Sequence, residues 1–130
     1  MCPKAKRYGR PYFESFLRRS QRNSQRNRKR LDLIRRYEED GCLLEIGCGR
    51  GEFLQMANEH FTVEGVDISL YAVKTVAADL ALSIRRADIE ESRLLEAAYD
   101  VVVVFNVLEH LREPPDVLHK IYGALRDGGL

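Results

Sequence analysis

Leu43-Leu44-Glu45-Ile46-Gly47-Cys48-Gly49-Arg50-Gly51 is a short apolar run that breaks into three glycines at alternate positions. Glycine has no Cβ and reaches positive φ without a clash, so the backbone can turn sharply and approach a ligand closely. A helix that begins after such a turn points its free N–H groups into the same space. The pattern therefore predicts a strand, a tight turn and a helix around a site for S-adenosylmethionine, NAD or a phosphate.

A carboxylate follows at the spacing of a neighbouring strand. Residues 61–67 are typical of a second strand that ends on an acid, and Asp67 lies 20 residues beyond Gly47. In a βαβ unit this offset puts the acid at the tip of the adjacent strand, where it can accept both hydroxyls of a ribose. Glu52 stands where the dinucleotide fingerprint has Gly or Ala, and its charge would lie close to a pyrophosphate. The spacing therefore favours a ligand without phosphates over NAD.

Four further segments follow the glycine stretch in a recognisable order. They are Val66–Ser69, Arg86–Ile89, Phe105–Leu111 and Leu125–Leu130. Leu44–Gly51 resembles motif I of the class I S-adenosylmethionine-dependent methyltransferases. The four later segments resemble, in order, the ribose-binding strand end, the adenine-binding acid, the segment after strand four and the turn before strand five of that family. Asp127 stands where that turn usually has proline. The resemblance covers residues 42–130 and implies S-adenosylmethionine as cofactor.

The resemblance also implies a set of cofactor-binding residues. They are Glu45, Gly47, Cys48, Gly49, Gly51, Asp67, Ile68, Asp88, Ile89 and Asn106. By resemblance, Glu45 supports the cofactor's ammonium, Asp67 takes the ribose hydroxyls and Asp88 accepts from the adenine amino group. Ile68 and Ile89 pack on the adenine ring, the glycines pass beside the methionine portion, and the Asn106 carbonyl faces the methionine amine.

Each of these roles has a structural alternative. The glycines can serve close packing alone, Asp67 can cap the helix that opens at Ser69, and Asp88 can be a turn residue. Cys48 is expected to fill a small site between the glycines rather than to act as a nucleophile.

The candidate catalytic residues follow the fourth predicted strand. His110 is the candidate general base, beside Glu109, with an orienting or structural role as the alternative. A methyl group on a sulfonium is already activated, so catalysis is mainly alignment, and a base is needed only if the acceptor must lose a proton. No metal site is predicted, because the three cysteines lack ligand-like spacing to histidine.

From Gly41 onward short apolar runs alternate with amphipathic stretches, which predicts an α/β fold with a Rossmann-like parallel sheet and helices on both faces. The expected strands lie near 42–46, 61–66, 82–86 and 99–105, and the expected helices near 51–59, 69–80 and 115–126. Val101–Phe105 is apolar on both faces, which is typical of a central parallel strand.

The predicted domain, residues 41–130, stops after the fourth strand and the helix that follows it. The family fold has seven strands, so we expect a fragment of a longer methyltransferase in which strand four is a bare apolar edge. The alternatives are that a partner supplies the missing strands or that the product does not turn over. Such an edge favours self-association.

Residues 1–40 form a predicted basic helical extension. Residues 1–36 hold 13 Lys and Arg against two acids, whereas the remainder holds eight against 18. Helical spacing of Tyr12, Phe13, Phe16 and Leu17, and again of Leu31, Ile34 and Tyr37, predicts two helices or one bent helix. Between them, Arg18, Arg22, Arg26 and Arg30 share one helical face. Residues 18–36 are either a solvated face or a docking surface for nucleic acid, an anionic membrane or an acidic substrate.

The composition, 45% apolar and 32% charged over 130 residues, fits one core. No run has the length and apolarity of a transmembrane helix, and the expected compartment is cytoplasmic, although the Arg-rich start also resembles a mitochondrial transit peptide. The motif set resembles small-molecule methyltransferases of the quinone-biosynthesis type, which act on oxygen or carbon. The alternatives are an NAD-dependent oxidoreductase and a non-catalytic module that uses its arginine-rich helix.

Overall fold

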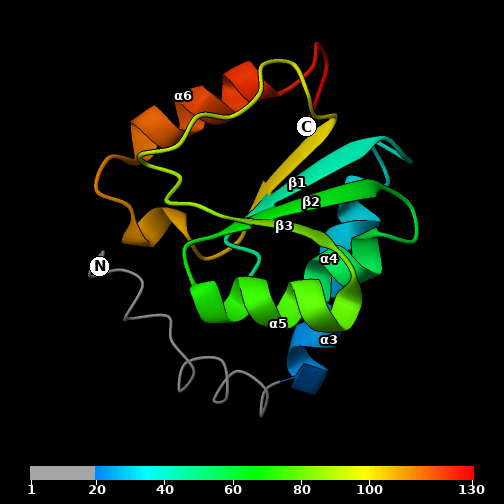
Figure 1. The fold of residues 1–130 in the computed structure, drawn as a ribbon. Helices are drawn as coiled ribbons and strands as arrows, with labels where there is room; N and C mark the ends of the chain where they lie inside the picture. The colour runs from blue at the N-terminus through cyan, green and yellow to red at the C-terminus, as the bar shows by residue number, and fades with distance from the viewer. Residues whose placement is uncertain (1–19) are drawn as a thin grey trace.

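A computed structural model describes residues 20–130 of the chain, and its centre is a parallel sheet of four strands (Figure 1). The strands are β1 (Cys42–Ile46), β2 (Thr62–Asp67), β3 (Ser83–Arg86) and β4 (Val101–Val104). The α-helices are α3 (Ser20–Ile34), α4 (Glu52–Ala57), α5 (Leu70–Leu80) and α6 (Pro114–Ala124), and the 3-10 helix η1 spans Leu108–His110. The strand order is β3-β2-β1-β4. The predicted Rossmann-like parallel sheet is therefore confirmed.

Helices cover both faces of this sheet: α3, α4 and α5 lie on one side and α6 on the other (Figure 1). Alternate residues of β1 point to opposite faces, so Leu43 packs in the cluster with α3 and α4, and Leu44 packs with α6. The same alternation sends Val101 and Val103 of β4 toward the first cluster. Both clusters support the strand ends at which the candidate site lies.

Gly65 in β2 is required by close packing rather than by a turn. It pairs in register with Glu45 of β1. A Cβ at Gly65 would lie 2.6 Å from both Ile84 Cδ1 and Leu54 Cδ1, and 2.9 Å from the Cys48 sulfur. The missing side chain therefore lets α4, β3 and the glycine turn converge on one point of the sheet.

The outer edge of β4 is not bare where the chain passes Leu130, which corrects one expectation. The Leu130 N–H donates to the Asp100 carbonyl at 2.9 Å, and the Val102 N–H donates to the Leu130 carbonyl at 2.9 Å. This is the pattern of a parallel neighbour. The start of β4 thus has hydrogen-bonded backbone on both sides, at Asp100 and Val102, although β4 remains the last strand in the sheet order.

Several predicted boundaries were too wide or misplaced. β4 begins at Val101 instead of residue 99, because Tyr99 forms an isolated parallel bridge with Leu125 instead. The polar segment before Leu31 is not a break, since α3 runs through it from Ser20. Tyr37, which was predicted at helical spacing with Leu31 and Ile34, lies beyond the end of α3 and is 70% exposed. The predicted apolar helix over Tyr12–Leu17 lies outside the described residues.

The buried face of α3 carries Asn23, Asn27, Leu31 and Ile34, while Arg22 and Arg26 are exposed. This division explains how so polar a helix packs on the domain: two apolar residues and two asparagines meet the α4 side, and Arg22 and Arg26 remain in solvent. Within residues 20–130, no helix has both the length and the apolar character needed to cross a bilayer.

Candidate cofactor site

The turn after β1 takes the conformation that the alternate glycines predict. Gly47, Gly49 and Gly51 have φ angles of 78°, 55° and 72°. These angles lie in the left-handed region, which L side chains rarely adopt. A Cβ at Gly47 would also overlap Val107 Cγ2. The turn therefore depends on glycine for its dihedral angles and, at Gly47, for space as well.

Asp67 joins the end of β2 to this turn. Its Oδ2 accepts from the Gly49 N–H at 2.8 Å and its Oδ1 accepts from the Ser69 N–H at 2.7 Å. Burial raises the pKa of Asp67, and the two N–H donors oppose that rise. Each carboxylate oxygen can accept a further hydrogen bond, so Asp67 keeps acceptor capacity for ligand hydroxyls. Ser69, not Asp67, caps α5, since its Oγ accepts from the Ala72 N–H at 3.3 Å.

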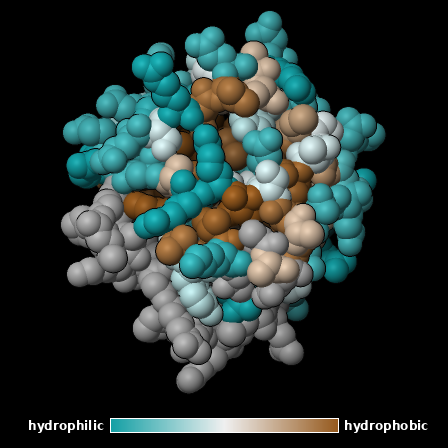
Figure 2. Space-filling view, viewed as in Figure 1, coloured by the Kyte–Doolittle hydropathy of each residue, from teal (hydrophilic) through white to brown (hydrophobic). Residues whose placement is uncertain are grey.

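A cavity opens at the carboxyl ends of β1, β2 and β4, where ligands bind in open α/β sheets. Its lining includes nine of the ten predicted cofactor-binding residues; they are Glu45, Gly47, Cys48, Gly49, Asp67, Ile68, Asp88, Ile89 and Asn106. Gly51 does not line the cavity but caps α4 behind it. On the face of the molecule in Figure 2, apolar side chains gather in a hollow below α6 and are framed by hydrophilic ones.

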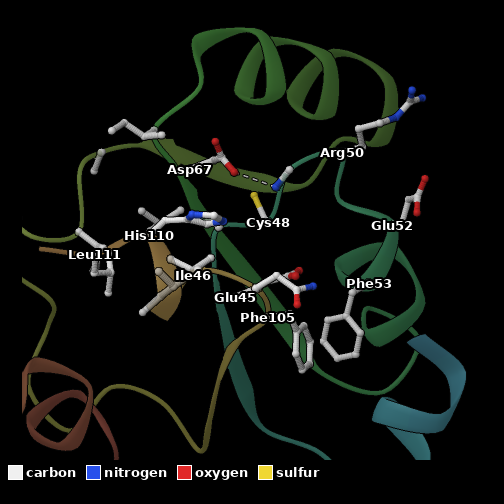
Figure 3. Close-up of a pocket in the computed structure, with 18 of the residues that line it drawn as sticks. Glu45, Ile46, Cys48, Arg50, Glu52, Phe53, Asp67, Phe105, His110 and Leu111 are labelled. Carbon is white, nitrogen blue, oxygen red and sulfur yellow. Dashed lines mark hydrogen bonds between the residues drawn. The ribbon is translucent and has the colours of Figure 1, made fainter. Parts of the chain in front are cut away.

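Glu45 lies at one end of this cavity, near Phe105 and Phe53, and Asp67 lies at the other (Figure 3). The Glu45 side chain is buried, with the residue 4% exposed, and its Oε2 has no hydrogen-bond partner among residues 20–130. Burial raises the pKa of Glu45 well above its usual range, and Arg30 opposes that rise. A buried acceptor without a partner costs free energy, so it marks a place where a ligand donor would be stabilised.

Arg30 and Asn27 of α3 also line the cavity, and the sequence reasoning missed both. The Arg30 guanidinium lies 3.9 Å from the centroid of the Phe105 ring, and its Nη1 donates to Asn27 Oδ1 at 3.2 Å. Arg30 forms no ion pair with another described residue. The Phe105 ring meets Phe53 edge-on at 5.0 Å, which fixes the platform under the guanidinium. Grouping Arg30 with the exposed arginines obscured its place beside the buried face of α3.

The loop after β3 supplies the opposite wall of the cavity. Asp88 and Ile89 both line it, and Ile89 is buried. Asp88 Oδ1 accepts from the Glu90 N–H at 3.0 Å, which is the turn geometry that we considered as an alternative role. The turn bond does not exclude ligand binding, because it holds the carboxylate at the cavity wall.

The two candidate catalytic residues are separated by the structure. His110, the last residue of η1, lines the cavity, and Figure 3 places it near Asp67 and Ile46. Glu109 is exposed and is not among the lining residues. Asn106, at φ 56°, turns the chain into the segment that carries His110. The geometry thus offers His110, and not Glu109, to a molecule in the cavity.

Cys48 is buried between the glycines, and burial raises the pKa of its thiol. A thiol that stays protonated is a poor nucleophile, so this placement supports the role of a small packing residue. Arg50 and Glu52 point away from Glu45 and Asp67 (Figure 3). Among residues 20–130 no group of three or more His, Cys, Asp or Glu side chains could hold a metal ion.

A family model described as a methyltransferase domain matches residues 16–130. Ubiquinone biosynthesis O-methyltransferase from Caulobacter sp. (strain K31) is 38% identical over 122 residues, which cover 78% of this chain and 48% of that protein. The chain spans about half the length of the curated relatives it matches. It belongs to the class I S-adenosylmethionine-dependent methyltransferase family, as the motifs predict.

Solved structures share the fold. An S-adenosylmethionine-dependent methyltransferase from Mesorhizobium loti is 25% identical with a TM-score of 0.60, over 65% of this chain and 41% of that chain. Phosphoethanolamine N-methyltransferase 2 of Haemonchus contortus, solved with S-adenosylhomocysteine, is 23% identical with a TM-score of 0.65, over 75% of this chain and 26% of that chain. The family match supports a methyltransferase over the NAD-dependent oxidoreductase, and these structures agree with it in fold.

Proposed function

We propose that the cavity binds S-adenosylmethionine and that the chain contributes to methyl transfer to a phenolic oxygen of a small molecule. The observation that carries the proposal is the pair of opposite charges at one end of the cavity. Glu45 is a buried acid with an unpartnered oxygen, and Arg30 is a partly buried cation without an ion pair among the described residues. This pair is complementary to the ammonium and the carboxylate of a free amino acid.

The remaining lining fits the rest of that cofactor. Asp67 stands at the tip of β2 with acceptor capacity for ribose hydroxyls, while Asp88 and Ile89 offer an acceptor and an apolar surface to an adenine. The glycine turn allows close approach of the backbone to the amino-acid portion. We infer that Arg30 is a further cofactor-binding residue, in addition to the ten named from the sequence. It would bind the carboxylate of the cofactor's amino-acid portion.

When bound, the cofactor supplies a methyl group that is already activated for displacement. The contribution of the chain is then to align an acceptor and to exclude water. His110 lies at the cavity and can hold or take the proton of an acceptor hydroxyl. The 38% identical relative, named for O-methylation in ubiquinone biosynthesis, supports a phenolic acceptor over a carbon acceptor.

The direct test is calorimetric titration of the protein with S-adenosylhomocysteine. We expect one site, with affinity reduced about tenfold or more in Asp67→Ala, because charge-assisted hydrogen bonds contribute about 1.5–3 kcal/mol. Glu64→Ala is the matched control, since Glu64 is an exposed acid of the same strand. Equal binding by the parent and Asp67→Ala would contradict the site assignment. No heat from the parent would contradict the function.

The acceptor is tested by radiolabelled methyl transfer from S-adenosylmethionine to a catechol. We expect product with the parent protein and a turnover at least tenfold lower in His110→Ala, with unchanged S-adenosylhomocysteine affinity, because a general base contributes typically 10²–10⁴-fold. Methylation at carbon, or full activity in His110→Ala, would exclude the proposed role of His110.

A further inference from the structure

Glu90 directly follows Ala87, Asp88 and Ile89, the three residues of the β3 loop that line the cavity, and its side chain is only 6% exposed. Its Oε1 accepts two backbone hydrogen bonds, from the Arg112 N–H at 2.6 Å and from the Glu113 N–H at 3.0 Å. These donors lie just beyond His110 and just before α6. One carboxylate oxygen therefore joins the wall formed by the β3 loop to the wall formed by the segment after β4.

A second connection runs from α6 to the same loop. The Lys120 Nζ donates to the Ile89 carbonyl at 2.9 Å and to the Glu90 carbonyl at 2.7 Å. Two consecutive carbonyls held by one ammonium fix the orientation of the peptide planes next to Asp88. Hydrogen bonds to a charged donor are roughly twice as strong as neutral ones, so this connection resists opening of the loop.

The side chain of Arg112 adds little to these contacts. Its Nε lies 3.5 Å from Glu90 Oε2 and its Nη2 lies 3.7 Å from Glu91 Oε1, in an exposed position. Exposed ion pairs at such distances contribute little. The backbone donors to Glu90 and the two bonds of Lys120 join the β3 loop to α6 and to the residues just before it.

We propose that Glu90 and Lys120 are positioning residues that fix Asp88 and Ile89 against the His110 segment and so set the base selectivity of the cavity. This inference rests on the proposed cofactor. An acceptor at Asp88 favours a base that carries an exocyclic amino group over one that carries a carbonyl at the same position. That preference depends on where the carboxylate is held, because hydrogen-bond strength falls steeply with distance and angle.

The test compares S-adenosylhomocysteine with S-inosylhomocysteine, in which the adenine amino group is replaced by a carbonyl oxygen. Both dissociation constants are measured by calorimetry on the full chain. We expect the parent to prefer S-adenosylhomocysteine by about tenfold or more, the effect of one lost hydrogen bond to a charged group. In Lys120→Met, which keeps the apolar stem and removes the ammonium, we expect this ratio to fall toward one.

Glu90 allows a pair of variants that separates positioning from charge. In Glu90→Gln the amide oxygen can replace Oε1 and accept from both N–H groups, so we expect the base preference to stay within about twofold of the parent. In Glu90→Ala both acceptors are lost, so we expect the preference to fall. Lys74→Met alters an exposed residue outside these contacts and should match the parent.

The outcomes distinguish this inference from the proposed function. A parent that binds neither compound would contradict the function itself. A parent that binds S-adenosylhomocysteine while Lys120→Met and Glu90→Ala keep the full base preference would overturn the positioning role alone. Equal binding of both compounds by the parent would also overturn it. If Glu90→Ala does not fold, Lys120→Met and Glu90→Gln still decide the question.

Discussion

The guanidinium carbon of Arg30 lies over the Phe105 ring at the cavity wall, 3.9 Å from the ring centroid. Arg30 comes from α3 and Phe105 from the end of β4, so helix and sheet meet in this contact. The stacking leaves most of the five guanidinium N–H donors available, since one bond, to Asn27, is formed with the described residues. The contact therefore positions a cation for a ligand.

Arg30→Gln should weaken S-adenosylhomocysteine binding by about tenfold to a hundredfold, because a charge-assisted contact to a carboxylate contributes about 1.5–3 kcal/mol. Arg26→Gln, one turn earlier and exposed, is the control and should bind as the parent does. Titration calorimetry measures both. Full affinity in Arg30→Gln would remove Arg30 from the site.

The pKa of Glu45 should make cofactor binding proton-linked. Burial raises this pKa in the folded protein, and a neighbouring ammonium would lower it, so binding should release protons at a pH below the folded pKa. Calorimetry in buffers of different ionisation enthalpy counts those protons. Glu45→Gln should release fewer protons, and an unchanged count in Glu45→Gln would argue against the ammonium contact.

The same shift predicts how stability depends on pH. Because the folded pKa of Glu45 lies above the unfolded one, the folded state holds this proton more tightly, so stability falls as pH rises from the unfolded pKa through the folded pKa. The melting temperature of Glu45→Gln should therefore exceed that of the parent at neutral pH. On the acid side it should change less with pH than the melting temperature of the parent does. Thermal melts over that range measure the difference. A variant less stable than the parent at neutral pH would contradict the shift.

Gly47→Ala should destabilise the fold and abolish S-adenosylhomocysteine binding. The added Cβ would overlap Val107 and would sit at a φ of 78°, and such strain costs about 1 kcal/mol or more. Adding Val107→Ala relieves the overlap but not the dihedral, so we expect partial recovery of the melting temperature. Gly123→Ala is the control: its Cβ meets nothing within 4 Å, and α6 should gain about 0.5–1 kcal/mol. If Gly47→Ala has the same melting temperature as the parent, the turn does not require glycine at this position.

Arg22 and Arg26 of α3 are exposed, so a docking surface for an anionic partner on this helix stays a prediction. Arg22→Gln combined with Arg26→Gln should reduce any salt-sensitive binding to anionic vesicles or RNA, and leave S-adenosylhomocysteine affinity unchanged. Co-sedimentation at low and physiological salt measures the first, and calorimetry measures the second. Equal binding by parent and variant would leave α3 as a solvated face.

The sequence was sufficient for the parallel α/β sheet, the glycine turn and the acids at the strand tips. Parallel strands place their carboxyl ends at one edge, so Gly47 and Asp67 could be brought together from spacing alone. The place of Arg30 at the cavity, with donors that no other residue of 20–130 takes up, could not be foreseen. Its position in a run of arginines suggested solvent, and only the packing of Asn27, Leu31 and Ile34 turns that part of α3 toward the sheet.

The local order of residues determined this protein's turns, its alternating strands and helices, and its family, because those depend on neighbours in the chain. Tertiary structure decided which side chains share the cavity. It separated Glu109 from His110, left Glu45 Oε2 buried without a hydrogen-bond partner among residues 20–130, and tied the β3 loop to α6 through Glu90 and Lys120. Contacts between residues some 20 to 30 positions apart depend on how the layers pack, and no local pattern records that packing.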